Sequence, residues 1–577
     1  MSAMKKFKFL SLFLILVLIL STAGCEKQPE AKERPMRVSE ATPTAVPTPT
    51  LTATPEASPT PEPTATPTAE PTTAPTTVPT AAPTPVPTVG GFEAPERGCS
   101  IDFPTRELYH YDMDLTLDAD AHTVGGHVVF RFYNDTEDTW NELCLRDYSS
   151  LFIDAETAGY PPSYKTNGAI TKITNIVDGR DDSELKITSD QDVTVLWIPL
   201  DQPLVPNESM TLSYDFTAKI PTVADRYGLY NGIFNVTNFY PILAEYADGE
   251  WSHAPYYQMG ECFYSEISDY DVRLTVPADF LVATTGTETG KQDNGETVTY
   301  TYNAPCVRDF VFSASDVFGI VDATYDGVHV NVLYNKKNPP ANNMKASLNA
   351  SLGAARDSLA AFGDAFGKYP YSELDIILAP IEAGGMEYPN LIIIEDSLCP
   401  SGLLEYSTSE DIYRDLEVCI AHEIGHQWFM GIVGSNSGMQ PWQDESITSY
   451  TELVYDEYLG KINEYIREFG RKARDLSDPA VAATLTRTGL FPLNRPYYDF
   501  SADRVYVLAV YSYGQQALFQ MEEIVGRDTF HSILREYVHR YAFTNAGAMS
   551  FFEVLFDCCG TDNAELNALV NAAFIMQ

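Results

Sequence analysis

The sequence contains few basic residues: 37 Lys and Arg stand against 80 Asp and Glu in 577 residues, a formal net charge of −43. Nucleic acids and anionic membrane surfaces are bound through basic faces, so this composition argues against both kinds of partner. Hydrophobic residues still make up 44% of the chain and aromatic residues 12%. That is enough for large cores and excludes wholesale disorder. The length suits two or three domains.

Cysteine is also sparse, with nine residues spread over nearly the whole chain. Their spacing shows neither a dense disulfide framework nor the paired C-x-x-C pattern of a structural zinc site. Cys419 lies in an apolar helical stretch, which predicts a core position. The adjacent Cys558 and Cys559 fit two interpretations, a redox-active pair or a chance neighbourhood, and we favour the second.

The first 25 residues resemble the signal peptide of a bacterial lipoprotein. Basic residues precede an apolar run from Phe9 to Leu20, which is shorter than the ~20 residues of a membrane-spanning helix. Small residues then lead to Cys25, with Thr22 where such signals usually have Leu. The resemblance implies lipidation of Cys25 and attachment to the outer face of the bacterial cell membrane. Release into the medium is the alternative.

Residues 26–92 are predicted to form a disordered stalk. From Ala41 to Gly90 the sequence is almost entirely Pro, Thr, Ala and Val, a composition that cannot bury a core and favours an extended polyproline-II chain. At ~3.1 Å per residue, about 60 residues would reach on the order of 190 Å. Such a stalk would hold the rest of the chain away from a lipid anchor.

The residue pattern of the remaining chain changes near residue 322, from strand-like runs to alternating helices and strands. Residues 93–322 contain short β-branched and aromatic runs separated by turn residues, which predicts an antiparallel β domain with strands at 127–133, 193–198, 270–276 and 298–302. Residues 323–577 are predicted to form an α/β domain. Its expected strands are 374–378 and 391–394, and its expected helices are 344–366, 411–430, 445–459, 513–525 and 528–541.

One of these predicted helices carries the pattern H-E-x-x-H, from His422 to His426. Residues four apart lie on one face of an α-helix, so the two imidazoles can bind a single zinc ion with bonds of ~2.0–2.1 Å. Glu423 is rotated away from that pair, where a carboxylate can act as general base on a water molecule. Two structural histidines on a helix are the alternative.

A catalytic zinc ion needs a third protein ligand and one open position. Glu445 opens the next predicted helix, 19 positions after His426. The intervening glycines allow the chain to turn and bring the second helix alongside the first. Asp444 is the rival ligand, and a charge at a helix N-terminus is the structural alternative for Glu445.

Three ordered motifs together resemble the gluzincin zinc aminopeptidases typified by aminopeptidase N. The first is H-E-x-x-H, followed after eighteen residues by Glu445. The second is Gly384-Gly385-Met386-Glu387-Tyr388, similar to G-x-M-E-N, and the third is Tyr511 to Gly514, similar to Y-x-K-G. The segment 308–314 also resembles the end of that family's N-terminal β domain. The resemblance covers about residue 100 to the C-terminus.

The resemblance implies a role for each matching residue. His422, His426 and Glu445 would hold one zinc ion per chain, and Glu423 would be the general base. Tyr511 would donate its phenol to the oxyanion; Tyr506 and Tyr513 are rivals that only the Y-x-x-G frame sets aside.

The G-x-M-E-N-like segment would bind the substrate. Glu387 would hold the free α-ammonium, which restricts cleavage to the first residue of a peptide. Gly384 and Gly385, flanking Met386, would let the backbone approach the peptide closely.

This sequence departs from the family pattern at two positions. Tyr388 stands where the motif has Asn, and Tyr513 stands where Y-x-K-G has Lys. The expected architecture is a β-rich, saddle-like N-terminal domain followed by a thermolysin-like α/β metallopeptidase domain. We expect no helical C-terminal domain. The expected function is aminopeptidase activity on peptides with a free N-terminus outside a bacterial cell. A zinc endopeptidase and a catalytically silent surface peptide-binding module are the alternatives.

Overall fold

The computed structural model describes residues 92, 94–159, 164–247, 249–256, 260–261, 263–401, 410–462 and 475–576. The predicted signal segment with Cys25 lies outside the described residues, as does the predicted stalk up to residue 91. Within the described ranges, every helix is too short or too polar to cross a bilayer.

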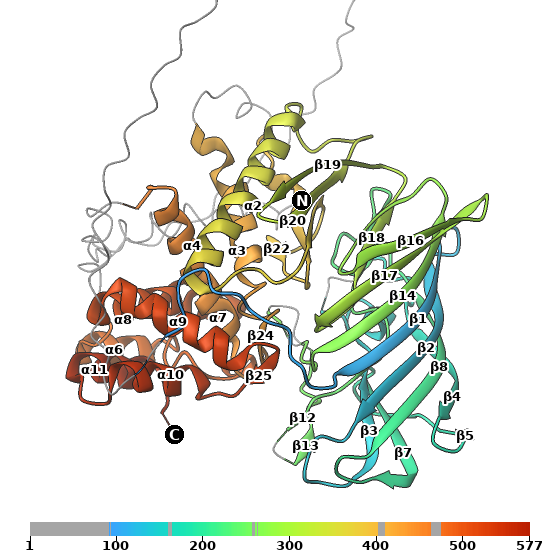
Figure 1. The fold of residues 1–577 in the computed structure, drawn as a ribbon, viewed down its shortest axis with the longest axis horizontal. Coiled ribbons are helices and arrows are strands. Elements are labelled where there is room, and N and C mark those ends of the chain that lie inside the picture. Colours follow the sequence, from blue (N-terminus) through green and yellow to red (C-terminus); the bar gives the residue numbers. More distant parts are fainter. Residues whose placement is uncertain are drawn as a thin grey trace, which may run out of the picture. The chain divides into compact units, whose positions relative to one another are not determined.

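An eight-stranded sheet forms much of the β-rich part of the fold, at the right of Figure 1. Alternate residues are buried along its strands, as in β1 (Tyr109–Asp118), because successive side chains point to opposite faces. β1 pairs in parallel with β14 and antiparallel with β2. The spatial order is β16 (Thr287–Asp293), β17 (Thr297–Val307), β14 (Ser268–Pro277), β1, β2 (Thr123–Tyr133), β8 (Ser209–Lys219), β4 (Thr171–Asp178) and β5 (Ser183–Glu184).

Two four-stranded sheets complete the β-rich part. Predicted strands 127–133, 270–276 and 298–302 lie within β2, β14 and β17, whereas β7 begins at Val195, two residues later than expected. One small sheet has the order β15 (Leu281–Thr284), β18 (Phe312–Ser315), β10 (Ile233–Val236) and β9 (Gly228–Tyr230). The other has the order β11 (Ile242–Leu243), β3 (Trp140–Arg146), β7 (Val195–Leu204) and β6 (Thr188–Ser189); η1 (Tyr148–Ile153) and the hairpin of β12 (Tyr246–Ala247) and β13 (Glu250–Trp251) are also present.

The second half begins with a mixed five-stranded sheet. Its central strand β21 (Glu373–Ala379) is buried almost throughout, as expected for a strand covered on both faces. The order is β19 (Phe318–Tyr325), β20 (Val328–Asn335), β21, β23 (Leu391–Glu395) and β22 (Gly385–Met386), with β22 antiparallel at the edge. The change of residue pattern predicted near residue 322 therefore falls inside β19. Predicted strands 374–378 and 391–394 are present.

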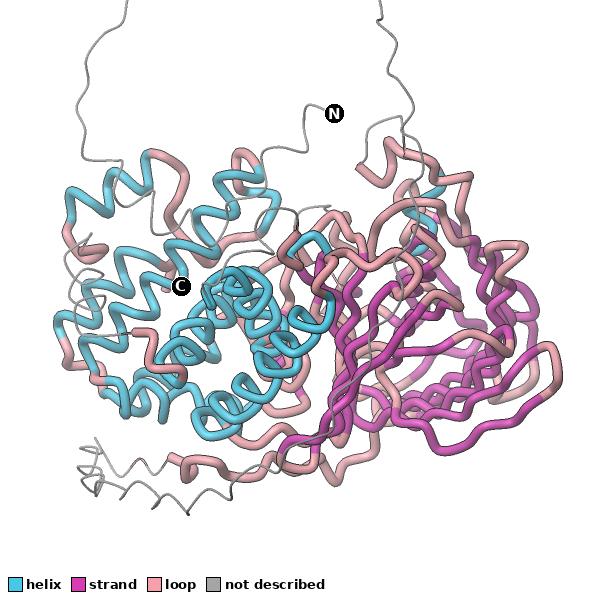
Figure 2. The backbone as a smooth tube through the Cα atoms, turned by 90° about the horizontal axis from the view of Figure 1, so that it is seen from above, coloured by secondary structure: helices cyan, strands magenta, loops and turns pink. Residues whose placement is uncertain are grey.

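Helices gather on one side of the structure and strands on the other (Figure 2). α2 (Met344–Phe366) has the predicted bounds, but α3 (Arg414–Gly425) is shorter than the predicted 411–430. The helix ends there because the N–H of Gly431 bonds to the carbonyl of His426 in a wide turn. A Cβ on Gly431 would lie 2.8 Å from the carbonyl oxygen of Gln427, so only glycine fits this turn.

α3 packs against α2 and against the next helix, α4 (Ile447–Tyr458). α4 follows a π-helical turn, η5 (Trp442–Ser446), so the predicted helix 445–459 starts in π geometry. A second π-helical turn, η7 (Leu508–Tyr513), precedes α8 (Gly514–Val525). The other described elements are η2 (Asp396–Leu398), η4 (Glu410–Tyr413), β24 (Val433–Ser435), α6 (Pro479–Arg487), η6 (Tyr497–Asp499), α7 (Asp503–Val507), α9 (Arg527–Tyr541), β25 (Thr544–Ala546), α10 (Ser550–Cys559) and α11 (Ala564–Ala573).

Candidate active site

Three side chains from α3 and η5 converge on one point. Nε2 of His422 and Nε2 of His426 lie 3.2 Å apart, and Oε2 of Glu445 lies 3.3 Å from the first and 3.4 Å from the second. Zinc ligands at ~2.0–2.1 Å in tetrahedral geometry are separated by about 3.3 Å. The three donor atoms therefore already have the spacing of three corners of a zinc tetrahedron.

Each imidazole has a partner on its other nitrogen. Nδ1 of His422 lies 2.9 Å from Oε1 of Glu452, and Nδ1 of His426 lies 2.7 Å from Oδ1 of Asp444. Such carboxylate–histidine contacts fix the orientation of a metal-binding ring. Asp444, the rival ligand, also accepts a hydrogen bond from Ser437 at 2.7 Å. It therefore supports His426 from behind, while the adjacent Glu445 faces the donor atoms.

The electrostatics of this cluster favour an ionised Glu445. Its side chain is buried, which by itself would raise its pKa, but His426 and His422 hold the pKa of Glu445 well below its usual range. An ionised carboxylate among imidazoles is the state that a zinc site requires, because metal ligands must be deprotonated.

Glu423 lies beside the donor cluster without joining it. Carboxyl oxygens of Glu423 and Glu387 and a ring nitrogen of His426 lie within 4.8 Å of one another. Burial raises the pKa of Glu423 to about 7, against the opposing effect of the two histidines. Such a carboxylate can accept a proton near neutral pH and release it again.

Gly385 forms the wall next to Glu423. A Cβ at this position would lie 2.1 Å from Oε1 of Glu423, so any larger residue would displace that carboxylate. Gly384 has no such neighbour among the described residues, and Met386, the second residue of β22, is buried in the core. Gly385 and Met386 form the edge strand of the five-stranded sheet, next to α3.

Glu387 follows this edge and points a polar atom into the site. Its side chain is 4% exposed, and within the described part of the chain its Oε1 has no hydrogen-bond partner. Burial and the charge of Glu261 raise the pKa of Glu387 well above its usual range. A cationic group placed here would supply the missing partner and restore the ionised form.

Tyr511, on η7, reaches the same centre. Burial, followed by the charge of Glu445, raises the pKa of Tyr511 well above its usual range, and the Tyr511 ring stacks on that of His422 with centroids 6.1 Å apart. Tyr513 instead packs edge-on against Phe491. Tyr506 is buried next to Tyr511, with ring centroids 6.0 Å apart. Of the three tyrosines, Tyr511 is the one that contacts the donor cluster directly.

Glu261 is a site residue that sequence reasoning missed. It belongs to the β-rich half, lines a small cavity together with Glu387, and pairs with Arg226, whose Nη1 lies 2.8 Å from Oε2 of Glu261. Burial raises the pKa of Glu261, an effect that Arg226 opposes and Glu445 reinforces. The position follows a glycine in a segment without periodic pattern, so no local signal distinguishes it from a surface acid.

Arg308 holds the two halves together beneath the site. Its guanidinium donates to the carbonyls of Met430 at 2.7 Å, Ser265 at 2.9 Å and Thr544 at 2.7 Å. Met430 belongs to the turn after α3. The side chain therefore ties the exit of the H-E-x-x-H helix to the β-rich half.

Comparison with known proteins follows the same division of the chain. Residues 350–572 match the peptidase family M1 domain. The chain is similar to aminopeptidase M1-C of Oryza sativa subsp. japonica, at 24% identity over 33% of this chain and 21% of that protein. It is also similar to human aminopeptidase N, at 26% identity over 35% of this chain and 21% of that protein. The matched region thus spans about a fifth of these relatives.

Solved structures extend the likeness to both halves. A variant of an M1 zinc metallopeptidase from Deinococcus radiodurans, bound to a Tyr-Ser-Ala substrate, has a TM-score of 0.56 at 16% identity, covering 83% of this chain and 96% of that one. Another structure of an M1 zinc metallopeptidase from Deinococcus radiodurans has a TM-score of 0.54 at 16% identity, covering 83% of this chain and 97% of that one. Both halves therefore share the fold of these solved structures, and zinc is the metal that the matched M1 domain and the donor spacing indicate.

Proposed function

We propose that this chain, a member of the aminopeptidase N-like peptidase family M1, is a zinc aminopeptidase that removes the first residue from peptides with a free N-terminus. The observation that carries the proposal is the buried Oε1 of Glu387, which has no hydrogen-bond partner among the residues that the structure describes. A carboxyl oxygen of Glu387 lies within 4.8 Å of a carboxyl oxygen of the proposed base Glu423 and of a ring nitrogen of His426, which is close enough to fix where a bound peptide begins.

The chemistry divides among the residues of the site. When bound by His422, His426 and Glu445, zinc polarises a carbonyl and makes water a better nucleophile. Glu423 accepts the proton of the attacking water and passes it to the leaving amine. Tyr511 donates its phenol to the oxygen that becomes negative in the tetrahedral state, where a charged hydrogen bond strengthens.

Recognition of the N-terminus rests on two carboxylates from different halves of the chain. A free α-amine has an unperturbed pKa of about 7.7–8.0, so it is largely protonated near neutral pH. Glu387 and Glu261 line the same cavity, and burial, followed by the charge of Glu261, raises the pKa of Glu387. An ammonium group between them would neutralise this repulsion. Arg226, paired with Glu261, would keep Glu261 oriented.

The decisive experiment is a double cycle of Glu387→Ala and substrate N-acetylation. One peptide is offered with a free or an acetylated N-terminus to the wild type and to the variant. A buried charged hydrogen bond is worth about 1.5–3 kcal/mol, so each single change should lower kcat/KM by roughly ten- to a hundredfold or more. The two losses should not add, because each removes one side of the same pair. Glu382→Ala is the matched control, since Glu382 is exposed on the same loop.

The two alternatives predict different outcomes of this cycle. If the wild type cleaves the acetylated peptide as well as the free one, the protein is an endopeptidase. If the zinc-loaded wild type cleaves neither peptide, the silent binding module is the better description. If acetylation matters and Glu387→Ala does not, Glu261 holds the amine alone, and Glu261→Gln should then show the full loss.

We also propose that the enzyme acts outside a bacterial cell, attached to the outer face of the membrane through lipid on Cys25. The support is the sequence: a signal-like segment ending in Cys25, followed by a Pro/Thr-rich stretch. Metabolic labelling with a fatty-acid analogue should mark the full-length protein and fail to mark Cys25→Ala. An unlabelled wild type would leave secretion into the medium, with Thr22 as the reason for the failed signal.

A further inference from the structure

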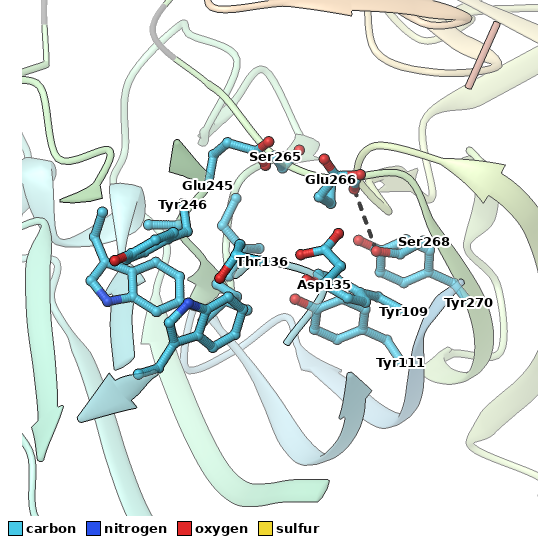
Figure 3. A pocket seen from close by; sticks show the side chains of 15 residues that line it. Tyr109, Tyr111, Asp135, Thr136, Glu245, Tyr246, Ser265, Glu266, Ser268 and Tyr270 are labelled. Carbon is cyan, nitrogen blue, oxygen red and sulfur yellow. Dashed lines mark hydrogen bonds between the residues drawn. The ribbon is translucent and has the colours of Figure 1, made fainter. Parts of the chain in front are cut away.

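A cavity of about 200 Å³ lies within the β-rich half, bordered by β1, β3 and the β12–β13 hairpin (Figure 3). Among the described residues, its lining includes none of those assigned above to zinc, proton transfer or the N-terminal amine. Ile242 and Ser265 border both this cavity and the smaller one that contains Glu387 and Glu261. The cavity therefore adjoins the active site without being part of it.

Aromatic rings form two walls of the cavity. Trp140 lies 4.7 Å from Trp251 and 5.5 Å from Tyr246, measured between ring centroids. On the other side, the rings of Tyr111 and Tyr270 stack at 4.8 Å. Aromatic faces attract cations, including alkylammonium groups.

Three acidic side chains share the same space. Figure 3 shows Asp135, Glu245 and Glu266 together at the cavity. Burial, and after it the charge of Glu266, raises the pKa of Glu245 well above its usual range and raises that of Asp135. Arg106 opposes the effect on Asp135, and Arg308 opposes the effect on Glu245. A cationic group placed in the cavity would favour the ionised form of both carboxyl groups.

Two polar atoms around the cavity have no partner among the described residues. They are Oε2 of Glu245 and Nε1 of Trp140, both shielded from solvent. The Trp140 side chain is only 2% exposed. Buried polar groups without partners cost free energy and are uncommon in native structures. A ligand that donates to Glu245 would satisfy the first, and an acceptor on the ligand or on an accompanying water would satisfy the second.

The spacing of the acids argues against a metal ion. Carboxylate ligands of one cation must come within a few ångströms of each other. Among the described residues, the groups whose donor atoms lie within 4.8 Å of one another do not include Asp135, Glu245 or Glu266. The three acids are instead spread around a space large enough for several non-hydrogen atoms, since one water takes about 30 Å³ in the liquid.

We propose that this cavity binds a small organic ammonium compound, with Glu245 and Asp135 as its acidic partners and Trp140 among its aromatic walls. The carboxyl groups would carry the recognition of charge, and the rings would exclude water and stabilise the alkyl chain. A neutral molecule of the same shape would give these carboxyl groups no cationic partner and should bind much more weakly.

The test uses n-butylamine as the probe and n-butanol as its neutral match, titrated into the full-length zinc-loaded protein. Trp140 and Trp251 line the cavity, so binding should change tryptophan fluorescence; calorimetry gives the stoichiometry. Glu245→Gln should weaken butylamine binding about tenfold or more, and Trp140→Phe should reduce both affinity and the fluorescence change. Glu250→Gln is the matched control, because Glu250 is exposed on the same hairpin.

The catalytic site could also attract an amine, so Glu387→Gln separates the two sites. Cavity binding should persist in Glu387→Gln and disappear in Glu245→Gln. Binding that disappears only in Glu387→Gln would overturn the proposal, as would equal binding of n-butanol or no binding in the wild type. Circular dichroism of Glu245→Gln must match the wild type; an isosteric Asp135→Asn variant provides the same comparison should Glu245→Gln misfold.

The ammonium group could come from a free amine or from the side chain of a basic first residue in a substrate. This second source rests on the proposed peptidase function. Lysyl and leucyl substrates with the same leaving group distinguish the two: Glu245→Gln should lower kcat/KM for the lysyl substrate alone if the side chain reaches the cavity. If Glu245→Gln lowered kcat/KM for neither substrate while the wild type still bound butylamine in the cavity, the cavity would be assigned to a free amine. Butylamine binding needs no turnover, so it still decides the proposal if peptidase activity is absent.

Discussion

The hydroxyl of Tyr388 donates a hydrogen bond to Oδ1 of Asn238, with the two oxygens 2.7 Å apart. Tyr388 directly follows Glu387, and Asn238 belongs to the β-rich half, where its Nδ2 donates to Asp309 at 2.8 Å. The residue that departs from the family's Asn thus links the proposed amine-binding loop to the other half of the chain. Both side chains are buried, so the bond is not exchanged with water.

Tyr388→Phe should therefore loosen the loop that carries Glu387. Leaving Oδ1 of Asn238 buried without this donor should lower the free energy of unfolding by about 1–3 kcal/mol. It should also raise KM for peptides with a free N-terminus more than it lowers kcat. Chemical unfolding and steady-state kinetics measure the two effects. The exposed Tyr230→Phe serves as control, and an unchanged KM would show that Glu387 is held without this bond.

The zinc content of two variants should distinguish Glu445, the proposed ligand, from Asp444, which contacts a ligand from behind. Glu445→Ala should bind little zinc, because one of the three donor atoms is removed. Asp444→Asn keeps all three donors and loses only the carboxylate behind His426, so zinc affinity should fall by about 10–100-fold. Competition with a chelator, followed by elemental analysis, measures both. If Asp444→Asn lost more zinc than Glu445→Ala, the two roles would be reversed.

The general base can be removed without changing the shape of the site. Glu423→Gln should retain zinc and the folded structure but lose about 10²–10⁴-fold in kcat. Gly385 lies against this side chain, and the isosteric amide avoids a clash there. Zinc analysis and circular dichroism confirm that the variant is intact. A kcat near that of the wild type would exclude Glu423 from proton transfer.

Stability should depend on pH through Asp375, a buried residue near the start of β21. Burial, and then the charge of Glu373, raises the pKa of Asp375 to about 7 in the folded chain. In the unfolded chain the carboxyl of Asp375 ionises near pH 4. Between pH 4 and 7 this carboxyl therefore holds more protons in the folded chain than in the unfolded chain. As the pH rises from 4 to 7, this group should lower the free energy of unfolding by at most about 1.4 kcal/mol per pH unit. Above pH 7 it should cause no further decrease.

Asp375→Asn removes that titration and should flatten the slope. In the wild type the N–H of Thr284 donates to Oδ2 of Asp375 at 2.9 Å. The amide oxygen of the variant can accept the same bond, and the side-chain amide of Asn331 must then rotate to accept from the new NH2 group. Urea unfolding at several values between pH 5 and 7 gives the two slopes. Identical slopes for variant and wild type would mean that Asp375 is ionised throughout.

Local periodicity and motif order were enough to predict the architecture. Strand-forming runs before residue 322 and the H-E-x-x-H helix after it are local signals, and the family resemblance joined them correctly. α3 was predicted too long because the wide turn at Gly431 depends on a close approach to Gln427, which no residue pattern displays. Cys419 was expected in the core and is instead partly exposed.

The parts of the site that escaped prediction depend on contacts between the two halves. Glu261 faces Glu387 only after the β-rich half packs against the helical half, and its partner Arg226 lies 35 positions earlier in the chain. The hydroxyl of Tyr388 likewise finds Asn238 across 150 positions. A sequence motif consists of residues that are close together in one helix, strand or turn. These pairs instead form when separate elements pack against each other.

The two π-helical turns, η5 and η7, fix the number of residues that the chain can have at these two places. η5 carries Asp444 and Glu445, η7 carries Tyr511, and they meet where the Ser446 hydroxyl donates to the carbonyl of Val510 at 2.6 Å. A π-turn contains one more residue than an α-turn, and each helical residue advances by about 100°. Deleting one residue from either turn would rotate its carboxylates or its phenol away from the donor cluster. Relatives that keep this chemistry should therefore vary in sequence at these two turns without gaining or losing a residue.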